Sequence, residues 1–200
     1  QHSYYYLLKM VRLLQLNNKF ILASKSPRRI ELLQLLLPDF EVEVSHLDEL
    51  INPELSNEDL VMDLALLKAN DISKSNKEAV VMGFDTLVIL DGKPMGKPKD
   101  RDDAFNMLKS LSNYTHTVLT GCAIVHNGQI DMFYDSAQVT FNPMTNDEIN
   151  EYLDTDEPYD KAGAYGIQGY GAKYIKKIDG DYYSVMGMPL QKLYNKLRRL

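Results

Sequence analysis

Hydrophobic and polar positions follow one another along the chain in segments that predict strands and helices by turns. Apolar or alternating runs predict strands at 20–23, 40–44, 80–90, 117–126, 129–141, 173–178 and 182–186. Apolar residues at helical spacing, with suitable flanking residues, predict helices at 27–37, 57–73, 102–111 and 145–153, and a last helix from Pro189. This order of elements predicts a layered α/β domain.

Turn and cap residues mark several of the expected ends. Asp91-Gly92 and Asn127-Gly128 are dipeptides typical of type I′ hairpin turns. Asn57 is a residue type favoured at a helix N-cap, and Thr145 with Glu148 matches a capping box. We therefore expect paired strands around both dipeptides and helices that begin near Asn57 and Thr145.

Size and charge narrow the classes of function. The 200 residues are enough for one substantial domain or two small lobes. The net charge of −6 disfavours a diffuse electrostatic contact with nucleic acid or with an anionic membrane. No apolar run approaches the about 18 residues of a membrane span. Any basic cluster must act locally, which favours a small phosphorylated ligand.

The single cysteine and the N-terminal segment add little chemistry. Cys122 stands alone in an apolar run, so no disulfide can form within the chain and we expect a buried thiol. This cysteine usage is compatible with a reducing compartment, and we expect a cytoplasmic location. Residues 1–18 are interpreted as an extension without the order of a signal peptide, and residues 19–200 as the functional domain.

The segment Ser24-Lys25-Ser26-Pro27-Arg28-Arg29 lies where the first strand ends and the first helix begins. Ser26 suits the N-cap and Pro27 the first helical position. Cations in a first turn oppose the helix dipole by about 0.3–1 kcal/mol each. A bound anion would reverse that sign. A solvated basic turn is the alternative.

Asp85 interrupts the most apolar strand, 80–90. An unpaired buried carboxylate is costly, so Asp85 should meet a cation, a metal ion or a cleft. Capping by Thr86 or by a lysine is the structural alternative. Farther along, Pro94 and Pro98 stiffen the turn that carries Lys97, which suits a phosphate contact or an ordinary surface turn.

A glycine-rich run, residues 156–171, follows the helix at 145–153. Its glycines permit a ligand to approach the backbone. Tyr165 and Tyr170 offer flat faces, and Gln168 offers a donor and an acceptor suited to a base edge. A structural loop with stacked tyrosines would show the same pattern. The chain has no phosphate-binding Gly-x-x-x-x-Gly-Lys motif, no dinucleotide fingerprint and no zinc-protease motif.

Several of these segments together resemble the Maf family of nucleoside triphosphate pyrophosphatases. The matching pieces are the segment from Leu22 to Arg29, Phe84-Asp85-Thr86, Gly96-Lys97-Pro98 and the run from Glu157 to Gly169. Their order and spacing also fit, and the resemblance extends from about Phe20 to Leu193. The first ten or so residues have no counterpart.

The resemblance implies an elongated α/β fold of the Maf and inosine-triphosphatase type, with a mixed sheet and two lobes flanking a substrate cleft. It implies hydrolysis of a nucleoside triphosphate to the monophosphate and pyrophosphate with a divalent cation, Mg²⁺ or Mn²⁺, in a homodimer. The run from Asp160 to Gly169 resembles the branch that acts on dTTP and UTP rather than the branch that acts on 7-methyl-GTP.

The resemblance also assigns roles by position. Asp85 corresponds to the proton acceptor, and Glu49 and Asp85 are expected to help hold the metal ion. Positions linked to substrate selectivity are those of Arg28, Thr86 and Gln168. The polar cleft is expected to include Ser24, Arg29, Glu49, Lys68, Lys97 and Lys161. Leu67 stands where an acidic residue is often found, which weakens the assignment of Lys68.

Three alternatives stay open at this point. A related pyrophosphatase for inosine-type or methylated nucleotides would keep the chemistry and change the base. A regulatory protein would bind nucleotide without turnover. A DNA-binding role for the basic turn is disfavoured by the net charge of −6.

Overall fold

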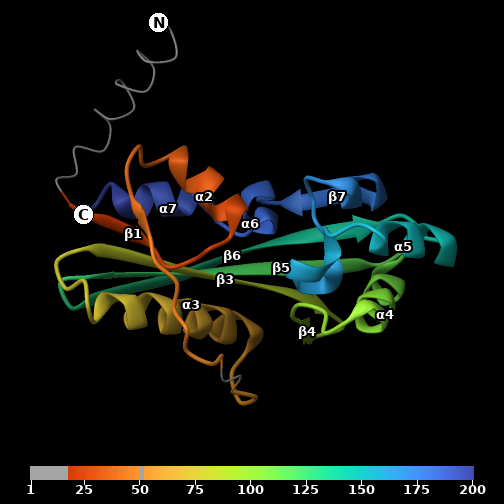
Figure 1. Ribbon diagram of the computed structural model, residues 1–200, viewed down its shortest axis with the longest axis horizontal. Helices are drawn as coiled ribbons and strands as arrows, with labels where there is room; N and C mark the ends of the chain where they lie inside the picture. The colour runs from red at the N-terminus through yellow and green to blue at the C-terminus, as the bar shows by residue number, and fades with distance from the viewer. Residues whose placement is uncertain (1–17, 50–51) are drawn as a thin grey trace, which may run out of the picture.

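The computed structural model describes residues 18–49 and 52–200. The predicted extension, residues 1–18, therefore lies outside the described residues except for Asn18. Seven strands form one mixed sheet in the order β2-β1-β3-β5-β6-β7, with β4 paired to β3 (Figure 1). β1 pairs in parallel with β2 and β3, and all other pairs are antiparallel. The prediction of a mixed-sheet α/β fold is confirmed.

The strands are β1 (Phe20–Leu22), β2 (Glu41–Val42), β3 (Val80–Leu90), β4 (Lys93–Met95), β5 (Thr115–His126), β6 (Gln129–Phe141) and β7 (Ile175–Gly180). The helices are α2 (Pro27–Gln34), α3 (Asn57–Ser73), α4 (Arg101–Leu111), α5 (Asn146–Leu153), α6 (Tyr182–Met186) and α7 (Leu190–Leu197). Three 3-10 turns fall in and after the glycine-rich run: η1 (Pro158–Asp160), η2 (Ala162–Ala164) and η3 (Tyr170–Tyr174).

The long strands β3, β5 and β6 connect two groups of helices. At one end, α3 covers one face of the sheet while α2, α6 and α7 cover the other (Figure 1). At the opposite end lie α4 and α5, with a separate apolar cluster around Leu108, Phe141 and Tyr152. This arrangement agrees with the predicted elongated shape, and the middle of β3, which carries Asp85, lies between the two groups.

Two glycines set the position of α3 on the sheet. A Cβ atom at Gly83 would overlap the carbonyl oxygen of Ala65, and one at Gly121 would overlap that of Val61. Only glycine lets the helix backbone lie this close to the strands. The close contact brings Lys68, on the next turn of α3, to the side of Asp85.

The predicted strand at 182–186 is wrong, because this segment is the helix α6. The carboxylate of Asp181 accepts hydrogen bonds from the N–H groups of Tyr183 and Ser184, which starts a helix. Gly187, at φ 109°, ends it in the left-handed conformation. Local capping therefore prevails over the strand preference of the two tyrosines.

Other boundaries shift by smaller amounts. The strand expected at 40–44 is reduced to two exposed residues, the first predicted helix ends at Gln34, and the strand expected after Asp91-Gly92 is the short β4. The second helix does begin at Asn57, but the N-cap is Ser56, whose hydroxyl accepts from the N–H of Asp59. The predicted hairpin turns, the capping box of Thr145 and the buried Cys122 are confirmed.

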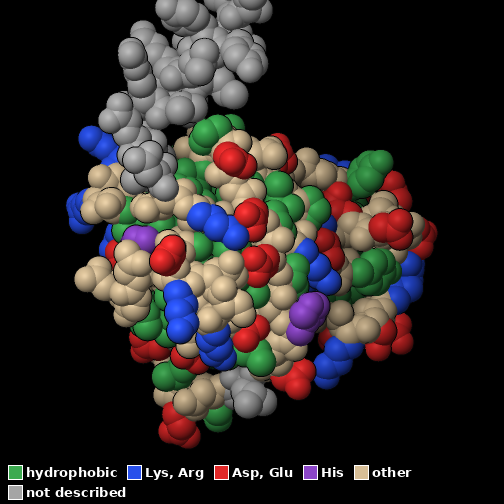
Figure 2. Space-filling model, turned by 60° about the vertical axis from the view of Figure 1, so that its left-hand side comes forward, with side chains coloured by type: hydrophobic (Ala, Val, Ile, Leu, Met, Phe, Trp, Pro, Cys, Tyr) green, Lys and Arg blue, Asp and Glu red, His purple; other side chains and the backbone are tan. Residues whose placement is uncertain are grey.

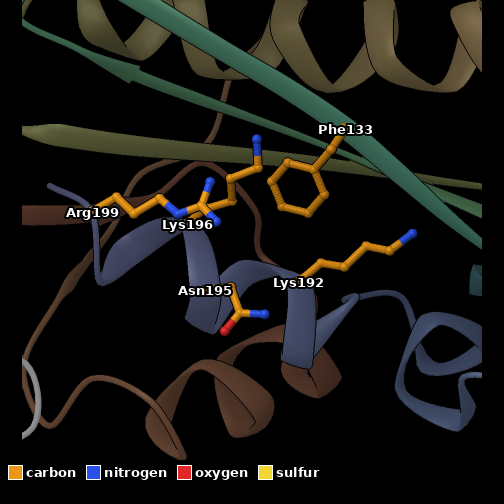
Figure 3. Close-up of a pocket in the computed structure, with 5 residues that line it drawn as sticks. All are labelled: Phe133, Lys192, Asn195, Lys196 and Arg199. Atoms are coloured by element: carbon orange, nitrogen blue, oxygen red, sulfur yellow. The ribbon is translucent and has the colours of Figure 1, made fainter.

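Lysines from α7 cover the edge of β6 that β7 leaves unpaired. Lys192 donates to the carbonyl oxygen of Tyr134 at 3.0 Å, and the amino group of Lys196 lies 5.4 Å from the centre of the Phe133 ring (Figure 3). Lysines are a common protection of exposed strand edges against pairing. The shallow pocket lined by these side chains is thus part of the edge's cover.

Acidic and basic side chains are interspersed on the face shown in Figure 2, in keeping with the absence of a broad basic surface on that side. Within the described residues, no helix combines the length and the apolar character needed to cross a bilayer.

Candidate active site

Two carboxylates and one ammonium group meet beside the middle of β3. The Nζ atom of Lys68 lies 2.6 Å from Oδ1 of Asp85 and 2.9 Å from Oε1 of Glu49. Asp85 is buried to 9% exposure, whereas Glu49 reaches in from an exposed segment. The structure therefore brings three of the predicted residues together, and Asp85 has the lysine partner considered as its structural alternative.

The same geometry fits a divalent cation. Asp85 and Glu49 each direct an oxygen at the Lys68 ammonium group, so the two carboxylates lie close enough to share one cation, and carboxylate oxygens are the ligands that Mg²⁺ and Mn²⁺ prefer. The described residues contain no group of three or more His, Cys, Asp or Glu side chains arranged for a metal ion. Two carboxylates alone suit an ion that is completed by water and substrate phosphate, which is the usual mode for Mg²⁺.

Arg29 is the centre of a second set of contacts. Its Nε–H donates to the carbonyl oxygen of Gly187 at 2.9 Å, and its two terminal nitrogens donate to Thr86 Oγ1 at 3.0 Å and Ser24 Oγ at 3.3 Å. The guanidinium also lies 5.8 Å from the centre of the Phe84 ring. All three hydrogen-bond acceptors are neutral.

Burial lowers the pKa of Arg29 despite the nearby charge of Asp85. Among the described residues, no carboxylate lies within ion-pair distance of Arg29. Three of its five N–H groups are used, which leaves two for a further partner. A half-buried guanidinium of this kind is well suited to bind an anion.

The start of α2 adds backbone N–H groups to this region. Ser26 occupies the N-cap and Pro27 the first turn, as predicted, but the Ser26 side chain accepts no hydrogen bond from the helix. The first turn of α2 has no acidic residue. Its N-terminus is therefore left without the usual side-chain cap, as an anion site requires.

Three further predicted cations surround Asp160, in η1. Arg28 Nη1 lies 3.6 Å from Asp160 Oδ2, and Lys161 Nζ lies 2.6 Å from Oδ1. Burial raises the pKa of Asp160, but the hydrogen bond and charge of Lys161, with the charges of Arg28 and Lys97, outweigh it and hold this pKa below its usual value. The turn that carries Lys97 is tied to the same region, since Gly163 N–H donates to the Gly96 carbonyl oxygen at 3.1 Å.

The glycine-rich run is folded around Glu157. Its carboxylate accepts hydrogen bonds from Tyr170 N–H at 2.7 Å, Gly171 N–H at 3.0 Å and the Tyr152 hydroxyl at 2.7 Å. A Cβ atom at Gly169 would overlap this carboxylate. This glycine thus makes room for an internal carboxylate, which is a structural task rather than the ligand contact expected from the sequence.

The side chains proposed to read a base have different surroundings. Tyr165 is buried, with its hydroxyl 2.7 Å from Nε2 of His116, and cannot offer a free face. Gln168 is exposed, and Tyr170 is 67% exposed. Of the three, Gln168 and Tyr170 stay accessible to a ligand.

Sequence reasoning missed three residues that organise the site. Asp160 and Glu157 were seen as parts of a motif, but their partners come from other elements. Thr120, which is fully buried, lies opposite Thr86 on the neighbouring strand. Only the register of β3 and β5 identifies it.

Comparisons with known proteins find relatives over most of this chain. A dTTP/UTP pyrophosphatase of Bacillus pumilus (strain SAFR-032) is 51% identical over 175 residues, which cover 88% of this chain and 93% of the relative. One of Bacillus cytotoxicus is 48% identical over 181 residues, covering 90% and 95%. Among solved structures, the Ham1 protein of Staphylococcus aureus matches with a TM-score of 0.47 and 18% identity over 79% of this chain and 80% of that one.

A family model described as Maf-like protein matches residues 19–200, nearly the whole chain and all of the elements described above. This chain therefore belongs to the Maf-like protein family.

Proposed function

We propose that this chain hydrolyses dTTP and UTP to the nucleoside monophosphate and pyrophosphate. The names of its relatives support these substrates. The structural observation that carries the proposal is Arg29, a half-buried cation with neutral partners and two free N–H groups. A triphosphate supplies the missing anionic partner.

The cations that bind the triphosphate lie on two sides of the site. Arg29 and the N-terminus of α2 bind phosphate oxygens on the side of β3. Arg28, Lys97 and Lys161 bind on the side of η1, where the charge of Asp160 offsets part of theirs. On this side they offset the charge that develops on the pyrophosphate leaving group.

Asp85 accepts the proton of the attacking water as that water approaches the α-phosphorus. Its position in the middle of β3, beside Lys68, fixes the carboxylate at a defined point of the site. Glu49 and Asp85 would hold a divalent cation, which when bound neutralises phosphate charge and makes a coordinated water more acidic. Lys68, which contacts both carboxylates, would hold the oxygens that such an ion leaves free.

Gln168 is the proposed reader of the base. Its amide offers one donor and one acceptor, which complement the O4 and N3–H groups shared by uracil and thymine. Cytosine reverses this pattern. Gln168 is exposed within the anchored glycine-rich run, which leaves its amide accessible.

A panel of triphosphates tests the proposal. We expect pyrophosphate release from dTTP and UTP in the presence of Mg²⁺ or Mn²⁺, loss of release with EDTA, and recovery when the metal is restored. Faster release from ITP or 7-methyl-GTP would instead favour the modified-nucleotide alternative. Metal-dependent binding without release from any triphosphate would favour a regulatory nucleotide-binding protein.

A homodimeric state and a cytoplasmic location are also part of the proposal, as family expectations. Sedimentation of the purified chain tests the first of these, with a mass near twice the 22.9 kDa monomer expected. Fractionation of the source cells tests the second.

A further inference from the structure

Arg29 is held by a chain of hydroxyl groups that crosses the sheet. Arg29 Nη2 donates to Thr86 Oγ1 at 3.0 Å, Thr86 Oγ1 lies 2.8 Å from Thr120 Oγ1, and Thr120 Oγ1 donates to the Ser184 carbonyl oxygen at 2.7 Å. Thr86 and Thr120 are directly opposite each other on β3 and β5. We call Thr86 and Thr120 the hydroxyl chain.

The direction of every hydrogen bond in this chain is fixed by its ends. A carbonyl oxygen only accepts, so Thr120 must give its one proton to Ser184. A guanidinium only donates, so Thr86 must accept from Arg29. Between the two hydroxyls, therefore, Thr86 donates and Thr120 accepts.

This accounting leaves Thr86 without a proton for the substrate. Its single O–H is committed to Thr120, and its remaining lone pair would repel a phosphate oxygen. Thr86 is half-buried while Thr120 has no exposed surface, so the chain runs from the site into the core. A direct hydrogen bond from Thr86 to a phosphate would require breaking it.

The hydroxyl chain, Arg29 and the end of α6 together form a closed ring of contacts. Ser184, which accepts from Thr120, lies three residues before Gly187, whose carbonyl oxygen accepts from Arg29 Nε–H. A Cβ atom at Gly187 would lie 3.3 Å from Arg29 Nε and 3.4 Å from Thr86 Oγ1, so the guanidinium fits tightly against this turn. The C-cap of α6 thus holds Arg29 Nε directly, and the Ser184 carbonyl oxygen of the same helix holds Nη2 through the two threonines.

We propose that Thr120 and Thr86 are positioning residues that hold the Arg29 guanidinium in its triphosphate-binding orientation, and that Thr86 does not itself donate to the nucleotide. This inference rests on the proposed function for the identity of the anion. The contacts that orient Arg29 do not depend on which anion binds. Because Thr120 is buried and cannot contact a ligand, it acts through two intervening groups, Thr86 and Arg29.

The central test replaces Thr120 by valine, which keeps the shape and removes the hydroxyl. We expect Thr120→Val to raise KM for dTTP by about tenfold, the effect of weakening one hydrogen bond to a charged group. The kcat should change far less, because Arg29 binds the triphosphate before and during reaction. Thr120→Ser should return KM to within about threefold of wild type, since it restores the hydroxyl.

Two comparisons separate positioning from a general structural effect. Thr115→Val breaks a second threonine pair on β5, Thr115 with Thr140 at 2.8 Å, far along the strand from Arg29, and should leave KM unchanged. In an Arg29→Lys background, Thr120→Val should add no further rise in KM, because the effect passes through the guanidinium. If Thr120→Val does not fold, Thr86→Val breaks the same chain at a half-buried position and should give the same rise.

A nucleotide-free measurement distinguishes this inference from the proposed function. The Nη2–H signals of Arg29 in ¹⁵N NMR, assigned by their absence in Arg29→Lys, should exchange about tenfold faster with water in Thr120→Val, because Nη2 donates to Thr86. A wild-type protein without turnover would contradict the proposed function and leave this readout intact. Unchanged KM and unchanged Arg29 exchange in Thr120→Val would overturn the inference, as would a Thr120→Ser variant equally impaired.

Discussion

Glu157 gives the sharpest prediction about stability, because one carboxylate there organises the whole glycine-rich run. Oε1 accepts from Gly171 N–H and the Tyr152 hydroxyl, and Oε2 accepts from Tyr170 N–H. In Glu157→Gln, the amide can keep only one oxygen. Its NH₂ group must then face the N–H of Tyr170, or the two donors on the other side.

The expected cost follows from the number of bonds lost. One or two hydrogen bonds to a charged group are removed, and the site is half-buried, so we expect about 2 kcal/mol of lost stability at pH 7. For a chain of this size, that corresponds to a fall in Tm of about 4–8 °C. Thermal unfolding followed by circular dichroism measures it.

The pH dependence supplies an internal check. Burial raises the pKa of Glu157, but the hydrogen bonds from Gly171, Tyr152 and Tyr170 outweigh it and hold the pKa below the usual 4.5. The carboxylate therefore contributes stability above that pH, and loses it as the pH falls through the lowered value. The difference between wild type and Glu157→Gln should accordingly be full at pH 7 and shrink below about pH 4.5.

Glu151→Gln is the matched control for this prediction. Glu151 lies on α5, and its exposed carboxylate is 3.6 Å from Lys173, a surface pair expected to contribute less than about 0.5 kcal/mol. If Glu157→Gln unfolds at the same temperature as Glu151→Gln at pH 7, then Glu157 does not anchor the run.

Three further predictions concern the proton acceptor, the α3 contact and a buried histidine. Asp85→Asn should lower kcat by at least about a hundredfold while calorimetry still detects nucleotide binding, and full pyrophosphate release would remove Asp85 from its assigned role. Gly83→Ala should lower the free energy of unfolding, measured in urea, by about 3 kcal/mol because the added Cβ overlaps Ala65. Gly96→Ala, with open space around the added Cβ, should leave the free energy of unfolding unchanged. Equal costs for the two variants would contradict the close packing of α3. Burial lowers the pKa of His116 from 6.5 to about 4, so it is neutral in the fold and unfolding takes up one proton between these values. As the pH falls from 6.5 to about 4, the free energy of unfolding should therefore decrease by about 1.4 kcal/mol for each pH unit, and His116→Gln should lose this part of the slope; an unchanged slope would refute the assignment.

The parts of the fold that the sequence predicts correctly are those coded within a few residues. Asp91-Gly92 and Asn127-Gly128 adopt positive φ at both positions, as their turn type requires. Thr145 and Glu148 make the reciprocal bonds of a capping box. The same local reasoning fails at α6, where the capping carboxylate of Asp181 prevails over the strand preference of the segment.

The site was predicted as a set of residues but not as a set of contacts. The bonds from Arg29 to Thr86 and Gly187 span 57 and 158 positions, so no local pattern contains them. Thr120 reads as an ordinary strand residue until the register pairs it with Thr86. Glycine-rich sequence indicates close approach, but only the fold shows that Gly169 approaches Glu157.

Hydrolysis of dTTP in ¹⁸O-labelled water tests most directly whether water attacks the α-phosphorus in this site. Attack at that atom forms the new P–O bond on the nucleotide side, so mass spectrometry should find one ¹⁸O atom in dTMP and none in pyrophosphate. Label in pyrophosphate, or release of orthophosphate in place of pyrophosphate, would contradict the reaction proposed for Asp85 and the surrounding cations.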